Sequence, residues 1–171
     1  MTAKIGVLNI SDRASRFRLL TERLGVTIMG FDYRGYGRSE GTPTEEGLLA
    51  DARAARAYLA KKAGVAENEI VLYGQSLGGG VMVELASRDA VRGLILESTF
   101  TSLADVANHK FPLTPPGPLL RNRFDSLAKI ADCHAPVLIA HGEDDHLVPI
   151  AQANELFSAA NEPKWFVAVP E

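Results

Sequence analysis

The sequence predicts an α/β fold, in which a mainly parallel β-sheet carries helices on both faces. Two observations lead to this prediction. Short apolar runs of strand length alternate along the chain with segments whose apolar residues recur at helical spacing. The chain has 171 residues, 46% of them hydrophobic, which suits a single domain over residues 1–171 with a sizeable buried core.

The apolar pattern locates the individual elements. Strands are expected at residues 26–31, 70–73, 94–96, 136–140 and 165–169. Helices are expected before Gly25, up to Gly64, directly after Ser76 and over residues 149–160.

Capping residues predict where the second of these helices begins. Thr42 is the expected N-cap, Pro43 suits the first turn, and Glu45 completes a capping box. We therefore expect this helix to begin directly after Thr42.

Residues 98–127 lack the regular pattern of the rest of the chain. They contain Pro112, Pro115, Pro116 and Pro118, so they cannot form one long helix. We expect an excursion above the sheet that serves as a short proline-rich lid or as part of the pocket wall.

Composition argues against several classes of protein. The 18 basic and 21 acidic residues give a net charge of −3, which argues against a nucleic-acid surface. No apolar run approaches the roughly 18 residues of a membrane span, and the N-terminus shows no signal-peptide pattern. The single cysteine, Cys133, excludes an internal disulfide and a Cys-rich metal site. We expect a cytoplasmic protein without a cofactor or a metal.

Residues 74–78 read Gly-Gln-Ser-Leu-Gly, a G-x-S-x-G pattern between an expected strand and an expected helix. A tight turn at this point lifts the hydroxyl of Ser76 clear of the sheet. It also points the Leu77 N–H toward an oxygen that becomes negative in a tetrahedral intermediate. The sequence thus predicts a nucleophilic Ser76 with Leu77 in the oxyanion hole. The alternative is a glycine-rich turn in which Ser76 merely caps the helix.

Three motifs in this order resemble the α/β-hydrolase superfamily, and within it the small BEM46-like serine hydrolases. They are residues 32–39 (DYRGYGRS), 74–79 (GQSLGG) and 141–149 (HGEDDHLVP). The resemblance runs from about Asn9 to the C-terminus. It implies a minimal or truncated α/β-hydrolase core.

The resemblance also implies an acid and a base. Asp145 matches the family's acid, which orients a histidine that takes the proton of Ser76. The alternative is that Asp144 and Asp145 form a solvated turn. The family's histidine follows the last strand, whereas this sequence reaches Glu171 without it. His146, beside Asp145, is the possible substitute base.

The sequence leaves open which N–H, besides that of Leu77, would donate to the oxyanion. Residues 4–8 align with the family segment that supplies it, with Gly6 as the one glycine there. The Leu77 N–H therefore acts alone, or an N–H between Ile5 and Leu8 assists it.

These observations lead to a serine hydrolase of small carboxylic esters with short acyl chains, working through an acyl-enzyme on Ser76. An acyltransferase differs only in the acceptor. Two further hypotheses stay open: a catalytically impaired core or binding scaffold, and a chain that is the ordered part of a longer polypeptide. The early strands of the family's sheet have no counterpart in this sequence, so one edge of the sheet is expected to be exposed. Because an exposed sheet edge pairs readily with another chain, a homodimer through that edge is also expected.

Overall fold

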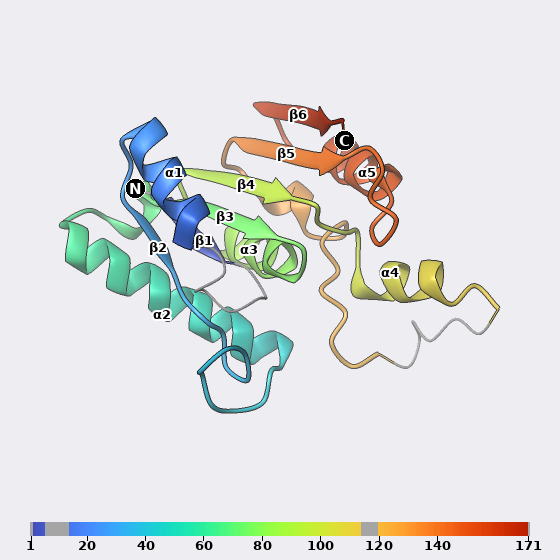
Figure 1. Cartoon of the computed structure of the whole chain (residues 1–171), viewed down its shortest axis with the longest axis horizontal. Coiled ribbons are helices and arrows are strands. Elements are labelled where there is room, and N and C mark those ends of the chain that lie inside the picture. Colours follow the sequence, from blue (N-terminus) through green and yellow to red (C-terminus); the bar gives the residue numbers. More distant parts are fainter. Residues whose placement is uncertain (1, 6–13, 114–119, 171) are drawn as a thin grey trace.

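The computed structural model describes residues 2–5, 14–113 and 120–170. It contains one sheet in which all neighbouring strands are parallel, in the order β2-β1-β3-β4-β5-β6 (Figure 1). The strands are β1 (Thr2–Ile5), β2 (Ile28–Gly30), β3 (Val71–Gln75), β4 (Gly93–Glu97), β5 (Val137–Gly142) and β6 (Lys164–Val169). The five expected strands are confirmed, and β1 is an addition, because residues 2–5 were not expected to form a strand.

The helices connect these strands. They are α1 (Ala14–Leu24), α2 (Glu45–Ala63), α3 (Leu77–Arg88), α4 (Leu103–Lys110) and α5 (Ile150–Ala159), with short 3₁₀ turns at Glu67–Glu69 and Ile130–Asp132. The predicted ends at Gly25 and Gly64 are confirmed; both glycines have a left-handed φ, of 62° and 66°. None of the helices within the described residues is long and apolar enough to cross a lipid bilayer.

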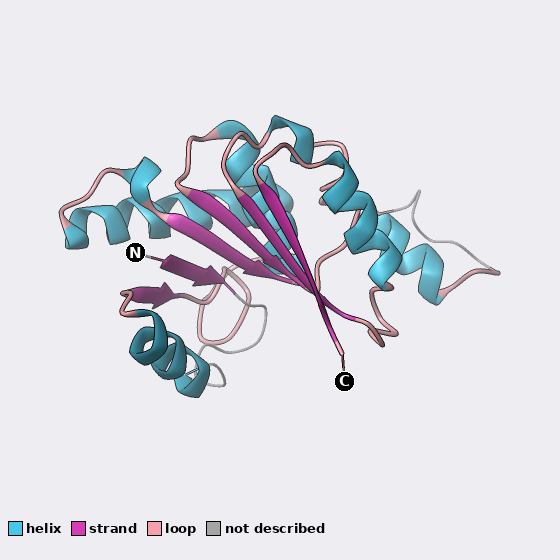
Figure 2. Ribbon diagram, turned by 90° about the horizontal axis from the view of Figure 1, so that it is seen from above, coloured by secondary structure: helices cyan, strands magenta, loops and turns pink. Residues whose placement is uncertain are grey.

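The two faces of the sheet are covered unequally (Figure 2). On the face that carries α2, α3 and α5, the strand residues are at most 1% exposed: Leu72, Leu94, Leu96, Val137 and Ile139. On the other face, α1 contributes Arg16, which pairs with Glu97 and lies over the ring of Tyr73. The prediction of helices on both faces is thus confirmed.

Helix α2 begins two residues later than expected. Thr44, not Thr42, is the N-cap, and its Oγ1 accepts a hydrogen bond of 3.1 Å from the Gly47 N–H. Glu45 does not complete a capping box with Thr42. Its carboxylate instead accepts hydrogen bonds from the backbone of Arg123 and Phe124, so a long-range contact overrides the local pattern.

The excursion at residues 98–127 leaves and returns through a narrow neck. Two backbone hydrogen bonds join its arms, from Leu103 N to Arg123 O (2.8 Å) and from Leu127 N to Thr101 O (3.0 Å). Helix α4 lies beyond this neck, so the excursion is more regular than expected. Residues 114–119, part of the expected proline-rich lid, lie outside the described part of the chain.

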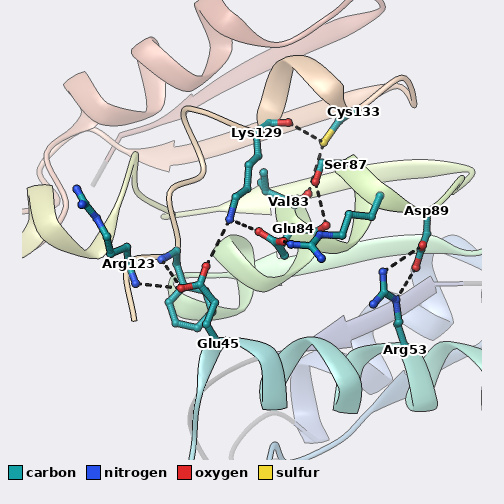
Figure 3. A network of polar contacts seen from close by, with 11 residues as sticks. Glu45, Arg53, Val83, Glu84, Ser87, Asp89, Arg123, Lys129 and Cys133 are labelled. Atoms are coloured by element: carbon teal, nitrogen blue, oxygen red, sulfur yellow. Dashed lines mark hydrogen bonds and ion pairs between the residues drawn. The ribbon is translucent and has the colours of Figure 1, made fainter. Parts of the chain in front are cut away.

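An ion-pair network holds the returning arm against α2 and α3 (Figure 3). Lys129 lies between Glu45 at the start of α2 and Glu84 on α3, and Arg88 also pairs with Glu84. Only 5% of the Glu84 side chain is exposed. A carboxylate this deeply buried needs such partners, because an unpaired buried charge costs several kcal/mol.

Replacing Gly74 with alanine tests the packing of α3 on β3. An added Cβ would lie 2.5 Å from Gly78 O and 2.6 Å from the Gly79 Cα, and backbone atoms cannot turn aside. We expect Gly74→Ala to lower the free energy of unfolding by about 3 kcal/mol in urea denaturation. Gly142→Ala, where no atom lies within 4 Å of the added Cβ, is the control and should change it by less than about 0.5 kcal/mol. Equal effects would contradict this packing.

Candidate active site

Ser76 occupies the turn between β3 and α3 with a strained backbone. Its φ is 51° and its ψ is −123°, a conformation that L-residues rarely adopt. Such strain, about 1–3 kcal/mol, persists only where the surroundings hold it. The G-x-S-x-G pattern therefore forms the strand–turn–helix that the sequence predicts.

Three hydrogen bonds hold the backbone of Ser76. Its N–H donates to Glu97 O on β4 (3.0 Å). Its carbonyl accepts from the Gly79 N–H (2.8 Å) and from the hydroxyl of Thr99 (2.9 Å). Thr99 is fully buried and fills the space where a Gly79 side chain would lie. Sequence reasoning missed Thr99, because it stands 23 residues from Ser76 in a segment without a recognisable motif.

The Ser76 hydroxyl is left available by this arrangement. The side chain makes no capping hydrogen bond to α3. Leu77 is the first residue of the 12-residue helix α3, so its N–H has no acceptor within the helix. Ser76 thus occupies the N-cap position of α3, but its side chain does not cap the helix.

Asp145 lies in the loop after β5 at the same edge of the sheet. Its Oδ1 accepts hydrogen bonds from the N–H groups of Leu147 and Val148, both at 2.9 Å, and 22% of its side chain is exposed. Strand β4 separates β3 from β5, so the two loops are about 10 Å apart, twice the usual strand spacing. One side chain is therefore needed between the Asp145 carboxylate and Ser76.

His141 supports the Asp145 loop from below. It is 1% exposed, its Nε2 donates to Val148 O at 2.7 Å, and the same atom lies 3.6 Å from the Asp145 carboxylate. These contacts make His141 a hydrogen-bonded structural residue.

His146 and Asp144 are both exposed. Among the residues that the structure describes, neither Ser76 nor Asp145 forms a hydrogen bond with His146. The role of His146 as a base therefore stays a prediction.

The possible second oxyanion segment is described only at its start. Ile5, the last residue of β1, is paired with Gly74, two residues before Ser76. Gly6, Val7 and Leu8 lie outside the described residues.

A polar cluster that the sequence did not reveal lies beside the turn. The Glu97 carboxylate accepts hydrogen bonds from Tyr73, Gln75 and Arg16. Since Gln75 and Glu97 are register partners on β3 and β4, this cluster fixes the ends of the two strands that hold Ser76.

A thiol nucleophile and a metal centre are both disfavoured in the described part of the chain. Burial, and to a smaller extent Asp132, raises the pKa of the Cys133 thiol to about 12, so Cys133 is protonated at neutral pH and a poor nucleophile. The described residues contain no group of three His, Cys, Asp or Glu side chains able to hold a metal ion. A cavity of about 800 Å³ between α2, α3 and the returning arm is lined largely by charged side chains and includes neither Ser76 nor Asp145.

Comparison with known proteins gives the family. A profile of the alpha/beta hydrolase family matches residues 11–169. The chain belongs to this family. It is 43% identical over 164 residues to an uncharacterized protein of Mycobacterium tuberculosis, covering 95% of this chain and 58% of that protein. It is 36% identical over 166 residues to protein bem46 of Schizosaccharomyces pombe, covering 91% of this chain and 54% of that protein. The BEM46-like resemblance is confirmed, and the chain spans little more than half the length of these relatives.

Solved structures support the same fold. Est1E from Butyrivibrio proteoclasticus, solved with ferulic acid, has a TM-score of 0.79 at 20% identity and is matched over 99% of this chain and 79% of that one. The esterase domain of a Rhodothermus marinus protein has a TM-score of 0.71 at 23% identity, over 99% of this chain and 75% of that one. At these identities the likeness shows the fold alone.

Removing the Asp145 carboxylate should loosen the loop after β5. Asp145→Ala leaves the N–H groups of Leu147 and Val148 without their acceptor, and Val148 is buried. We expect the free energy of unfolding to fall by about 1–2 kcal/mol in urea denaturation. Asp144→Ala, at an exposed neighbour, is the control and should stay within about 0.5 kcal/mol of wild type. A matching loss in both variants would contradict the role given to Asp145.

Proposed function

We propose that this chain carries the nucleophile and the acid of a serine hydrolase that acts on small carboxylic esters. The observation that carries the proposal is the strained turn at Ser76, whose hydroxyl makes no capping hydrogen bond to α3, at the sheet edge that also holds Asp145. Because the chain spans little more than half of its relatives, the activity and substrate of the complete protein belong to this proposal.

The proposed reaction has two halves. The Ser76 Oγ attacks the ester carbonyl carbon while a base takes the hydroxyl proton, and a tetrahedral oxyanion forms. The intermediate collapses, the alcohol leaves with the proton returned by the base, and the acyl group stays on Ser76. A water molecule then attacks this acyl-enzyme, releases the carboxylic acid and restores the hydroxyl.

The start of α3 supplies the stabilisation of the oxyanion. The Leu77 N–H has no helical acceptor, and the helix dipole adds partial positive charge at this end. An N–H from residues 5–8 is the proposed second donor. Losing one such donor typically costs about 10²–10³ in rate, so a single donor predicts a slow enzyme.

The base is a histidine held by Asp145. Within the 171 residues, His141 is committed to Val148, and His134 precedes β5 at the opposite edge of the sheet. His109 lies on α4 beyond the neck of the excursion. His146 is therefore the base we propose within this chain, and a histidine outside the 171 residues is the other source.

The proposed substrate is an ester with a short acyl chain. The excursion at residues 98–127 is short and the chain is small, which favours a small substrate. Neighbours in fold carry the names esterase and monoacylglycerol lipase, which agrees with an ester as the reacting group. The formation of a homodimer through an edge strand, β2 or β6, stays a prediction.

The second candidate is a binding scaffold without catalysis. The observation that favours it is the lack of any hydrogen bond, among the described residues, from a histidine to Ser76. Such a scaffold would keep the fold and the turn but hydrolyse no ester.

Replacing Ser76 with alanine tests the nucleophile. We expect Ser76→Ala to reduce hydrolysis of p-nitrophenyl acetate to the uncatalysed rate, because no other group can form the acyl-enzyme. Ser98→Ala is the matched control: Ser98 follows β4, also has a positive φ of 44°, and its loss should leave the rate within twofold. Equal rates for wild type and Ser76→Ala would overturn the hydrolase proposal and favour the scaffold.

Replacing His146 tests the base. If the 171-residue chain hydrolyses the ester, we expect His146→Ala to lower kcat about 10²-fold or more. His134→Ala is the control and should keep the wild-type kcat. An unchanged kcat in His146→Ala would assign the base to another histidine.

A further inference from the structure

The carboxylate of Glu97 lies on the face of the sheet that carries α1 (Figure 2). Side chains alternate between the two faces along a strand, so Tyr73 and Gln75 on β3 share this face with Glu97 on β4. The Glu97 side chain is 20% exposed. A largely buried carboxylate therefore stands beside the strand end that leads into Ser76.

Gln75 connects this carboxylate to the turn, because it directly precedes Ser76. Its Nε2 donates a hydrogen bond of 3.1 Å to Glu97 Oε1. Its own Oε1 is buried and has no hydrogen-bond partner within the described part of the chain. The bond to Glu97 therefore fixes the Gln75 amide. Since the Ser76 N–H donates to the Glu97 carbonyl at 3.0 Å, Glu97 holds the turn through its backbone and through its side chain.

Two further donors hold the Glu97 carboxylate itself. The Tyr73 hydroxyl and the Arg16 guanidinium both bond to Oε2, and Oε1 is left for Gln75. The guanidinium carbon of Arg16 also lies 5.9 Å from the centre of the Tyr73 ring. Hydrogen bonds that involve ionised groups are stronger than neutral ones, so these contacts give the carboxylate one orientation.

Arg16 brings α1 into this arrangement. No residue of α1 is buried. Among the ion pairs of the described residues, the one between Arg16 and Glu97 joins this helix to the sheet. The docking of α1 is therefore linked, through one carboxylate, to the residue that precedes Ser76.

We propose that Glu97 is a positioning residue for Ser76. Its carboxylate fixes Gln75, and with it the direction in which the Ser76 hydroxyl leaves the turn. Arg16 acts through Glu97 by holding that carboxylate in place. The effect on rate rests on the proposed hydrolase function, in which a misplacement of about 1 Å can cost about 10²-fold.

Pre-steady-state kinetics with p-nitrophenyl acetate test this role. Glu97→Ala removes the acceptor of Gln75. We expect the acylation rate at saturating ester to fall about tenfold or more, because the nucleophile is misdirected. The ester concentration that gives half of this rate should stay within about twofold, because binding of the ester is not affected. Glu97→Gln keeps an oxygen that can accept from Gln75 and should recover most of the lost rate.

Asp89→Ala is the matched control. Asp89 is also a partly buried carboxylate, with 24% of its side chain exposed, and it pairs with Arg53 and Arg56. It lies at the end of α3 opposite Ser76. We expect Asp89→Ala to lower the free energy of unfolding but to keep the acylation rate within about twofold, because distant sites act independently. All variants are compared at a temperature at which circular dichroism shows them folded.

Arg16→Gln tests whether Arg16 acts through Glu97. We expect it to lower the acylation rate about threefold in the wild-type background and to have no effect in Glu97→Ala, where its partner is already absent. Equal losses in both backgrounds would contradict this link between α1 and the turn.

Hydrogen exchange of the Ser76 amide supplies a measurement that does not depend on hydrolysis. We expect Glu97→Ala to raise its exchange rate about tenfold relative to amides in the middle of α3, because a loosened turn opens more often. Asp89→Ala should leave it unchanged. A wild type that hydrolyses no ester, together with this rise, would refute the proposed function but support the positioning role.

Two results would overturn the proposal. The first is an unchanged exchange rate of the Ser76 amide in Glu97→Ala. The second is an equal loss of acylation rate in Glu97→Ala and Asp89→Ala, which would mean general destabilisation. Either result would leave the cluster around Glu97 as a support of the sheet alone.

Discussion

The close approach of α3 to β3 is the constraint on which the rest of the site depends. The backbone of Gly78 and Gly79 passes so near Gly74 that no Cβ fits there. Only this approach makes the chain reverse sharply enough to put Ser76 at a φ of 51°. The strain is offset by bonds from outside the turn, since β4 contributes Glu97 O and the segment after it contributes the Thr99 hydroxyl. Ser76, the proposed nucleophile, is therefore held by two neighbouring strands and not by its own motif alone.

Local pattern predicted most of the elements, because each strand or helix presents its apolar residues at a fixed period. Local pattern failed where a distant group decided the outcome. Thr42 and Glu45 read as a capping box, yet Glu45 satisfies two backbone N–H groups nearly 80 residues away, and Thr44 caps the helix. The pairing of β1 between β2 and β3 is likewise a property of the assembled sheet.

The candidate site divides in the same way. The motifs predict roles for Ser76, Leu77 and Asp145, because each belongs to a short loop with a recognisable composition. The residues that support the turn could not be predicted in this way. Thr99 and Glu97 bond to residues more than 20 positions away, and no periodicity links them. Positive φ values at Ser98 and Phe124 are also invisible in the sequence, because neither is a glycine. Tertiary contacts alone fix these conformations.

The neck of the excursion packs against α3. Phe124 is buried in the neck, and its Cβ lies 3.1 Å from the position that a Gly80 side chain would take, while the Phe100 ring lies 3.4 Å from it. Both arms thus pack on the helix that begins directly after Ser76. A rotation of either arm would have to displace α3. The ion pair between Lys129 on the returning arm and Glu84 on α3 also holds the two together. The position of the excursion is therefore coupled to that of the helix that follows Ser76.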